Sequence, residues 1–157
     1  MAENQREGAI SNTAVGIAFE KAAKKFFEEK EGLILTRPYP VDIGLYHSLR
    51  KSHNFDLGNE TTIIECKSHT WTKGNNMPSA KMSVWNEAMY YFNLASSNYW
   101  KIFLVKKSLN KNGLSLIDYY FQTRFNFIPR DVCFYEYDED NNTCKKYTFE
   151  DVERLHK

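Results

Sequence analysis

Apolar side chains recur at helical spacing in two separate segments of the chain. Residues 14–31 contain few helix breakers and lie between possible N-caps at positions 11–13 and Gly32, which suits a helix end. The expected apolar stripe consists of Val15, Ala18, Phe19, Ala22 and Phe26. This pattern predicts an amphipathic helix with Glu20 beside its buried stripe. Lys24, one turn further on, offers a purely structural partner for Glu20.

The second helical segment spans residues 78–95. Pro78 stands where a helix commonly begins. The large apolar side chains that follow at helical spacing are Met82, Trp85, Met89 and Phe92. A second amphipathic helix is therefore predicted.

Shorter apolar runs predict strands. Residues 33–35 form one such run, and residues 53–57 and 61–68 are separated by a turn-forming segment, which is typical of a β-hairpin. Residues 99–105 are apolar or aromatic except for Lys101, which predicts a strand buried on both faces. The alternation of helices and strands favours an α/β fold.

The last third of the chain predicts smaller elements. Residues 114–127 are expected to be helical, and residues 132–137 and 145–148 are expected to form a hairpin around an acidic turn. Thr148 and Asp151 have the spacing of a capping box at the start of a final helix.

Length and composition favour one folded domain over residues 1–157. The chain is 42% hydrophobic and has no membrane-length apolar run, so we expect a cytoplasmic protein without a membrane partner. Its 3 cysteines, Cys66, Cys133 and Cys144, lack the spacing of a disulfide framework or a zinc site.

The net charge of +1 conceals an uneven distribution. Residues 41–113 carry nine Lys and Arg against five Asp and Glu, whereas residues 114–157 carry six against nine. The middle segment could therefore provide a nucleic-acid face or simply an ordinary solvated surface.

Candidate chemistry concentrates on the predicted hairpin. Alternate side chains of a strand share a face, so Glu65 and Lys67 project together, and Asp56 on the partner strand can converge with them. Two carboxylates can hold Mg²⁺ with several waters retained, and an ammonium can hold a water or stabilise phosphoryl oxygens. This combination suits phosphodiester hydrolysis. A structural α/β domain, in which the acidic pair is accidental, is the alternative.

The segment FDLGNETTIIECKS, with Asp56 followed by Glu65-Cys66-Lys67, resembles the PD-(D/E)XK nuclease superfamily of restriction-endonuclease-like folds. Glu20 in Gly16-Ile-Ala-Phe-Glu20 is similar to the glutamate that members place on the first helix. Asn86 and Tyr90 are similar to the glutamine and tyrosine of recombination-type members. Phe55 stands where the family name has proline.

The resemblance covers residues 14–105, with residues 106–157 as a C-terminal elaboration, and implies a mixed central β-sheet flanked by helices. It also implies that Asp56, Glu65 and the Cys66 carbonyl bind Mg²⁺, or Mn²⁺ as a substitute. Lys67 would handle the nucleophilic water, and Glu20 would act through water or a second metal.

DNA contacts are expected from the segment after the lysine strand and from the helix that follows. These candidates are His69, Thr70, Trp71, Thr72, Lys73, Asn75, Asn76, Lys81 and Asn86. A plain surface connection is the alternative for the loop. We expect a restriction-like endonuclease acting on double-stranded DNA as a homodimer, with a cognate methyltransferase as a possible partner. A repair or recombination nuclease and a catalytically inactive DNA-binding module are the other readings.

Overall fold

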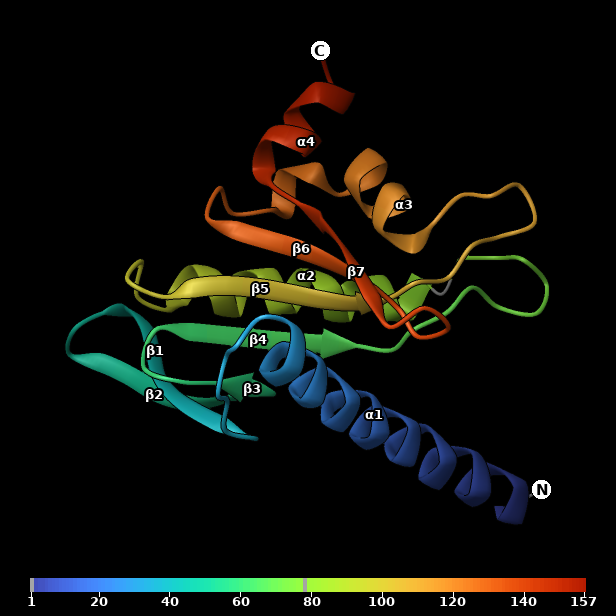
Figure 1. Cartoon of the computed structure of the whole chain (residues 1–157), viewed down its shortest axis with the longest axis horizontal. Coiled ribbons are helices and arrows are strands. Elements are labelled where there is room, and N and C mark those ends of the chain that lie inside the picture. Colours follow the sequence, from blue (N-terminus) through green and yellow to red (C-terminus); the bar gives the residue numbers. More distant parts are fainter. Residues whose placement is uncertain (1, 78) are drawn as a thin grey trace.

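A five-stranded mixed sheet, in the order β3-β4-β5-β6-β7, forms the centre of the protein (Figure 1). The computed structural model describes the backbone of residues 2–77 and 79–157, and the side chains of residues 13–77 and 79–157. The strands are β3 (Leu57–Gly58), β4 (Thr62–Lys67), β5 (Trp100–Lys106), β6 (Val132–Asp138) and β7 (Thr143–Tyr147). The three inner strands β4, β5 and β6 are parallel, and both outer strands are antiparallel to their neighbours. The predicted α/β class is confirmed at this level.

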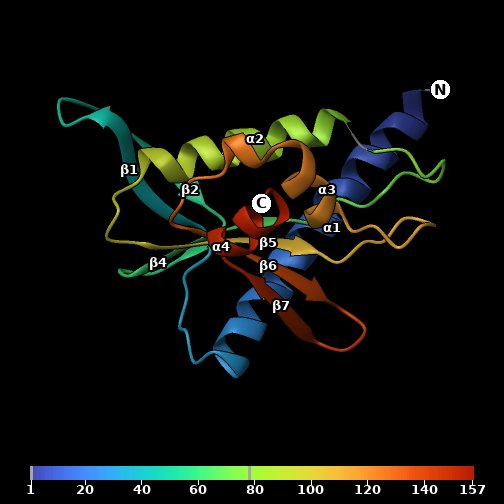
Figure 2. The same cartoon turned by 90° about the horizontal axis from the view of Figure 1, so that it is seen from above.

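Helices cover both faces of the sheet. The helix α1 (Ala2–Lys30) lies on one face, whereas α2 (Ser79–Leu94), α3 (Leu116–Thr123) and α4 (Phe149–Leu155) lie on the other (Figure 2). A single turn of 3-10 helix, Phe125–Phe127, follows α3. Each face therefore has its own apolar core, one packed against α1 and one against α2.

The inner strands are apolar on both sides because both sides are covered. On β4, Ile63 belongs to the α2 core, whereas Ile64 and Cys66 belong to the α1 core. Glu65 and Lys67 alternate with them and therefore share the α2 side, as predicted. The central position expected for residues 99–105 is also confirmed, because β5 pairs with β4 and β6.

A separate two-stranded sheet consists of β1 (Tyr39–Tyr46) and β2 (Leu49–Phe55). The predicted hairpin of residues 53–57 with residues 61–68 is therefore largely wrong. Residues 49–55 take their backbone partners from β1, and only Leu57 and Gly58 pair with β4. Asp56 consequently lies at the junction between the two sheets.

The first helix differs from its prediction at the N-terminal end. It begins at Ala2, so residues 11–13 lie inside it and are not N-caps. No proline interrupts the preceding residues, and the helix simply continues through them. The predicted C-terminal end is confirmed, since the helix stops at Lys30 and Gly32 adopts a positive φ of 67°.

The buried face of α1 is rotated from the predicted stripe. It consists of Phe19, Ala23, Phe26 and Phe27, whereas Val15 is 47% exposed. Glu20 lies next to this face because it shares the line of Gly16, Ala23 and Phe27.

Residues 33–35 do not form the predicted strand. Leu35 is buried, but the only pairing in this part of the described chain is an isolated bridge between Thr36 and Gly58. The other expected elements, α2, α3, the β6–β7 hairpin and α4, are present, and the capping box of Thr148 and Asp151 is confirmed. Pro78 lies outside the described residues. No described helix has the length and apolar character needed to cross a membrane.

Candidate functional site

Asp56 reaches the central sheet through its carboxylate. Its Oδ2 accepts a hydrogen bond of 2.8 Å from the backbone N–H of Cys66 on β4. The bond places the Asp56 carboxylate beside the residue that lies between Glu65 and Lys67. The three predicted reaction-centre residues are thus brought to one end of β4, although the connecting hairpin is shorter than expected.

Glu65 is almost fully buried, with 5% exposure, and has incomplete hydrogen bonding. Its Oε2 lies 3.5 Å from the Lys67 Nζ. Its Oε1 lies 3.6 Å from the His53 Nε2, and among the described side chains neither of these two buried atoms has a hydrogen-bond partner. An unpaired buried polar atom costs about 1–3 kcal/mol, so a fold that keeps one needs a reason to do so.

His53 is the neighbour of Glu65 that the sequence did not assign to the reaction centre. Its ring stacks on Tyr91 of α2, with centroids 3.9 Å apart and an interplanar angle of 21°. Phe55 meets the same ring edge-on at 4.7 Å. His53 is fixed by the β1–β2 sheet, whose pairing the sequence pattern did not reveal, so no sequence signal connected it with Glu65.

The electrostatics of Asp56 reflect the crowding of carboxylates. Burial, followed by the negative charge of Glu65, raises the pKa of Asp56 to about 7. Glu20 adds to this rise, whereas the Cys66 N–H and Lys67 oppose it. Burial likewise raises the pKa of the Cys66 thiol, which favours its protonated form.

Glu20 approaches this group from α1. Its Oε2 accepts a hydrogen bond of 2.8 Å from the Arg37 Nε. Lys24 pairs with Glu28 at 2.7 Å, so the helix pair between Glu20 and Lys24 is not formed. Arg37 lies in the connection between α1 and β1 and brings a cation to the edge of the acidic group.

The donor set can hold a hard divalent cation. No group of three or more His, Cys, Asp and Glu side chains with a metal-binding arrangement occurs among the described residues. Mg²⁺, however, commonly uses only one or two carboxylates and completes its shell with waters and substrate phosphates. The unpaired Glu65 Oε1 and the unfavourable charge on Asp56 both fit such an ion, because a dication would relieve them.

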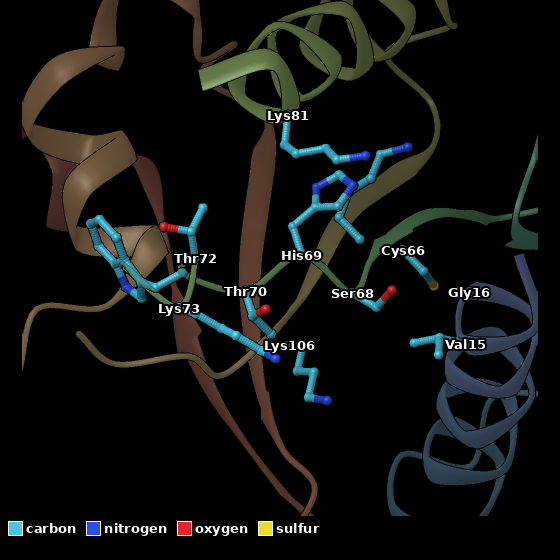
Figure 3. Close-up of a pocket in the computed structure, with 12 residues that line it drawn as sticks. Val15, Gly16, Cys66, Ser68, His69, Thr70, Thr72, Lys73, Lys81 and Lys106 are labelled. Carbon is cyan, nitrogen blue, oxygen red and sulfur yellow. The ribbon is translucent and has the colours of Figure 1, made fainter. Parts of the chain in front are cut away.

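A cleft of about 680 Å³ begins at the end of β4 (Figure 3). Lys67 lines it, and so do six of the nine predicted DNA-binding residues: His69, Thr70, Trp71, Thr72, Lys73 and Lys81. Ser68 and Lys106 add a hydroxyl and a further cation. The described residues that line this cleft include lysines but no carboxylate.

Lys106 was missed by the sequence analysis, although a signal was present. It ends β5, and the parallel register pairs Lys67 with Val105 immediately before it. Since the carboxyl ends of parallel strands lie at one edge of a sheet, a lysine after the buried strand could have been placed beside Lys67. Its Nζ lies 3.2 Å from the Glu139 carboxylate in the β6–β7 turn.

The other three predicted DNA-binding residues do not line the cleft. Asn75 accepts a hydrogen bond from the Lys111 N–H, and the backbone of Asn76 closes a turn with Thr72. Asn86 accepts a bond of 2.8 Å from the buried Tyr120 hydroxyl, which directs its amide toward α3.

Trp71 is anchored within the protein. Its backbone N–H donates to the Ser108 hydroxyl and its indole N–H donates to the Ser108 carbonyl, both at 3.1 Å. Its ring meets Tyr119 edge-on at 5.7 Å. These contacts fix the start of the loop that forms one wall of the cleft.

The site combines a buried acidic centre with an adjoining cationic cleft. Lys67 belongs to both, because its ammonium lies near Glu65 and its side chain lines the cleft. Such an arrangement can hold a divalent cation and a phosphate side by side. Comparisons with protein-family models, curated proteins and solved structures gave no match. Any function proposed for this site therefore depends on its geometry.

Proposed function

We propose that the protein is a magnesium-dependent endonuclease that hydrolyses phosphodiester bonds of DNA. The observation that carries the proposal is the buried Glu65 carboxylate beside Asp56 and Lys67, whose Oε1 has no hydrogen-bond partner among the side chains that the structure describes. A buried carboxylate oxygen without a donor destabilises the fold unless another ligand completes its interactions.

Asp56, Glu65 and the carbonyl oxygen of Cys66 are the groups that would hold the ion. When bound, Mg²⁺ neutralises charge on the phosphate and lowers the pKa of a coordinated water. Asp56 keeps its hydrogen bond to the Cys66 N–H, so its carboxylate stays oriented toward β4. His53, which Tyr91 holds by stacking, restricts the position of the Glu65 carboxylate.

Lys67 orients the attacking water or stabilises the phosphoryl oxygens as negative charge grows on them. Its side chain is half-buried, and its Nζ lies 3.5 Å from Glu65, so the ammonium is held at the boundary of the acidic centre and the cleft. Removal of one preorganised donor of this kind costs about a hundredfold or more in rate.

Glu20 is an outer member of the proposed site. Its charge acts on Asp56, and its pairing with Arg37 fixes it at the α1 side of the centre. In this role it would act through a water or a second ion.

The mixed sheet supports the resemblance to PD-(D/E)XK nucleases, and we propose the restriction-endonuclease-like fold on that basis. The acidic residues lie on and before an inner strand, with α1 on one face and α2 on the other. A homodimer with one site per protomer accounts for cleavage of both strands of a duplex, and sedimentation of the protein with and without DNA measures it.

The function is tested with purified protein on plasmid, linear duplex and single-stranded DNA, each with Mg²⁺, Mn²⁺ or EDTA. We expect cleavage only with metal, and a loss of about a hundredfold or more in the Lys67→Ala and Glu65→Gln variants. Lys25→Ala removes an exposed lysine of α1 and provides the matched control, which should cut at the wild-type rate.

Binding without cleavage under every metal condition would contradict the proposal and favour an inactive DNA-binding module of the same fold. Cleavage that persists in Lys67→Ala would remove Lys67 from the reaction. The fragments separate the two nuclease readings, because discrete sites indicate a restriction-like enzyme and cutting at ends or branches indicates repair or recombination.

A further inference from the structure

His69, which lines the cationic cleft, is hydrogen-bonded to the indole of Trp85. The Trp85 Nε1 lies 2.9 Å from the His69 Nδ1. An indole nitrogen can only donate, so the His69 Nδ1 must accept and cannot carry a proton. The neutral ring therefore carries its proton on Nε2.

The surroundings of His69 keep this ring neutral. Burial, together with the positive charges of Lys81 and Lys67, lowers the pKa of His69 to about 4. Trp85 is fully buried and packs edge-on against Phe103 of β5 at 5.2 Å. Trp85, which determines the tautomer of His69, is thus held in place by the apolar core.

The ring lines the cleft together with lysines that approach from several elements. Lys67 ends β4, Lys73 belongs to the following loop, Lys81 lies on α2 and Lys106 ends β5. Figure 3 shows Lys81 directed toward the His69 ring, with Lys73 and Lys106 on the other side of the loop. A neutral N–H donor beside the Lys81 ammonium, in a cleft that further lysines line, suits an anion that offers several acceptor oxygens, which is the chemistry of a phosphate.

We propose that this cleft binds an internal phosphodiester of a DNA strand, next to the one that is cut, and that His69 donates its Nε2–H to a phosphoryl oxygen. That the bound phosphate belongs to a DNA strand rests on the proposed nuclease function. Continuity favours an internal phosphate, because Lys67 lines both the acidic centre and the cleft. The volume of about 680 Å³ also exceeds what one phosphate needs.

His69 is accordingly a binding residue and not the general base. A ring whose Nδ1 accepts from Trp85 and whose Nε2 is protonated has no free lone pair to accept a proton from water. Its contribution to binding does not depend on a positive charge, in contrast to the lysines around it.

The first test is nitrogen-15 NMR of the wild-type protein labelled at histidine, in EDTA, between about pH 5 and 8. We expect His69 to show the Nε2–H tautomer throughout, and its Nε2 signal to shift when a short DNA duplex is added. A ring that titrates in this range, carries its proton on Nδ1, or does not respond to saturating duplex would overturn the proposal.

The second test is duplex binding in EDTA as a function of salt. His69→Phe retains an aromatic ring without a donor and should lower affinity about tenfold while leaving the salt dependence unchanged. Lys81→Gln should reduce the slope of log affinity against log salt by about 0.9, because one phosphate contact is lost. His69→Gln, which restores a neutral donor, should recover most of the affinity.

A third test measures whether inorganic phosphate competes with the duplex for the cleft. If it competes with the duplex at equal concentration, the cleft recognises a free or terminal phosphate and the internal-phosphodiester proposal fails. None of these measurements needs added metal or turnover, so a protein that binds as expected yet never cuts DNA would refute the proposed nuclease and leave the cleft assignment standing. The NMR test uses no variant and is unaffected by a variant that fails to fold.

Discussion

Asp56 makes the acidic centre costly to assemble without a cation. Its pKa rises from 3.8 to about 7, because burial and the charge of Glu65 disfavour its ionised form. The folded protein therefore binds more protons than the unfolded chain between these two pH values. The destabilisation that ionised Asp56 causes is absent below its unfolded pKa of 3.8. It grows as the pH rises toward 7 and is fully present above pH 7.

Asp56→Asn should stabilise the metal-free protein at alkaline pH. The amide oxygen can still accept from the Cys66 N–H, but the uncompensated charge is gone. In EDTA at about pH 8 we expect a gain on the order of 1–2 kcal/mol in the free energy of unfolding, measured with urea. The gain should vanish near the unfolded pKa of 3.8, where the wild-type carboxyl is protonated as well.

Magnesium provides the control for this prediction. It should raise the stability of the wild-type protein at alkaline pH and should have little effect on the variant, because the variant lacks one of the carboxylates. A variant that is less stable than the wild type at both ends of the pH range would show that Asp56 is held by favourable interactions and not by a need for a cation.

Sequence reasoning at this scale succeeded for residues close to one another in the chain and missed the partners that other segments bring to them. Glu65 and Lys67 could be assigned to one face because strand alternation is local. His53 reaches Glu65 only through the pairing of β2 with β1, and Arg37 reaches Glu20 from a different segment. Such contacts depend on tertiary packing, which spacing alone does not encode.

Among the secondary structure elements, β5 and α2 are joined by a buried lysine. Lys101 is 2% exposed, and its ammonium donates to the Ala95 carbonyl just after α2 and to the Asp131 carboxylate just before β6. The cation thus satisfies an unpaired carbonyl at a helix end, where positive charge is favourable. It also connects the starts of two parallel strands.

Asp131→Ala should destabilise the protein more than Lys101→Met. The first change leaves a buried ammonium with only the Ala95 carbonyl, whereas the second replaces the charge by an apolar side chain of similar length. Because Asp131 is partly exposed, we expect a loss of about 1–3 kcal/mol for Asp131→Ala, measured by urea unfolding. An equal or larger loss in Lys101→Met would mean that the ion pair itself stabilises the fold.

The elements that sequence predicted well have strong and uninterrupted patterns. The helix α2 carries its buried residues at regular helical spacing, and β5 is apolar on both faces. Residues 33–35 are equally apolar, but Leu35 is buried in the core that packs against α1, and Ile34 is 82% exposed. A short apolar run can therefore fill a gap in the core without forming a strand.

At the scale of the whole molecule, the junction between the two sheets positions the acidic centre. Gly58 of β3 lies directly against Tyr39 of β1, and a Cβ at Gly58 would lie 2.5–2.9 Å from three atoms of that side chain. One of these atoms is the Tyr39 Cβ, which cannot rotate away. The two sheets approach so closely at this point because residue 58 has no side chain.

Gly58→Ala should therefore separate the sheets and displace Asp56, two residues earlier in the chain. We expect a loss of about 1–3 kcal/mol in stability, together with a fall in cleavage that persists at temperatures where the variant is fully folded. Thermal unfolding followed by the DNA assay measures both. For stability alone, Gly16→Ala is the matched comparison, because a Cβ at Gly16 meets nothing within 4 Å and should stabilise the helix. Full activity in folded Gly58→Ala would show that cleavage does not depend on the close approach of the two sheets.

The loop from Ser68 to Met77 lines the cleft but contributes no carboxylate to the acidic centre. Hydrogen bonds connect it to distant segments of the described chain at three residues: Trp71 bonds Ser108, Asn75 bonds Lys111 and His69 bonds Trp85. During evolution, this loop can therefore diverge at its remaining positions without altering the residues that we propose to perform hydrolysis. Under the proposed function, a lineage of such proteins would acquire new DNA targets mainly through substitutions and insertions in this loop, while the end of β4 stays the same. The same separation makes the loop the segment to randomise in a selection for altered specificity.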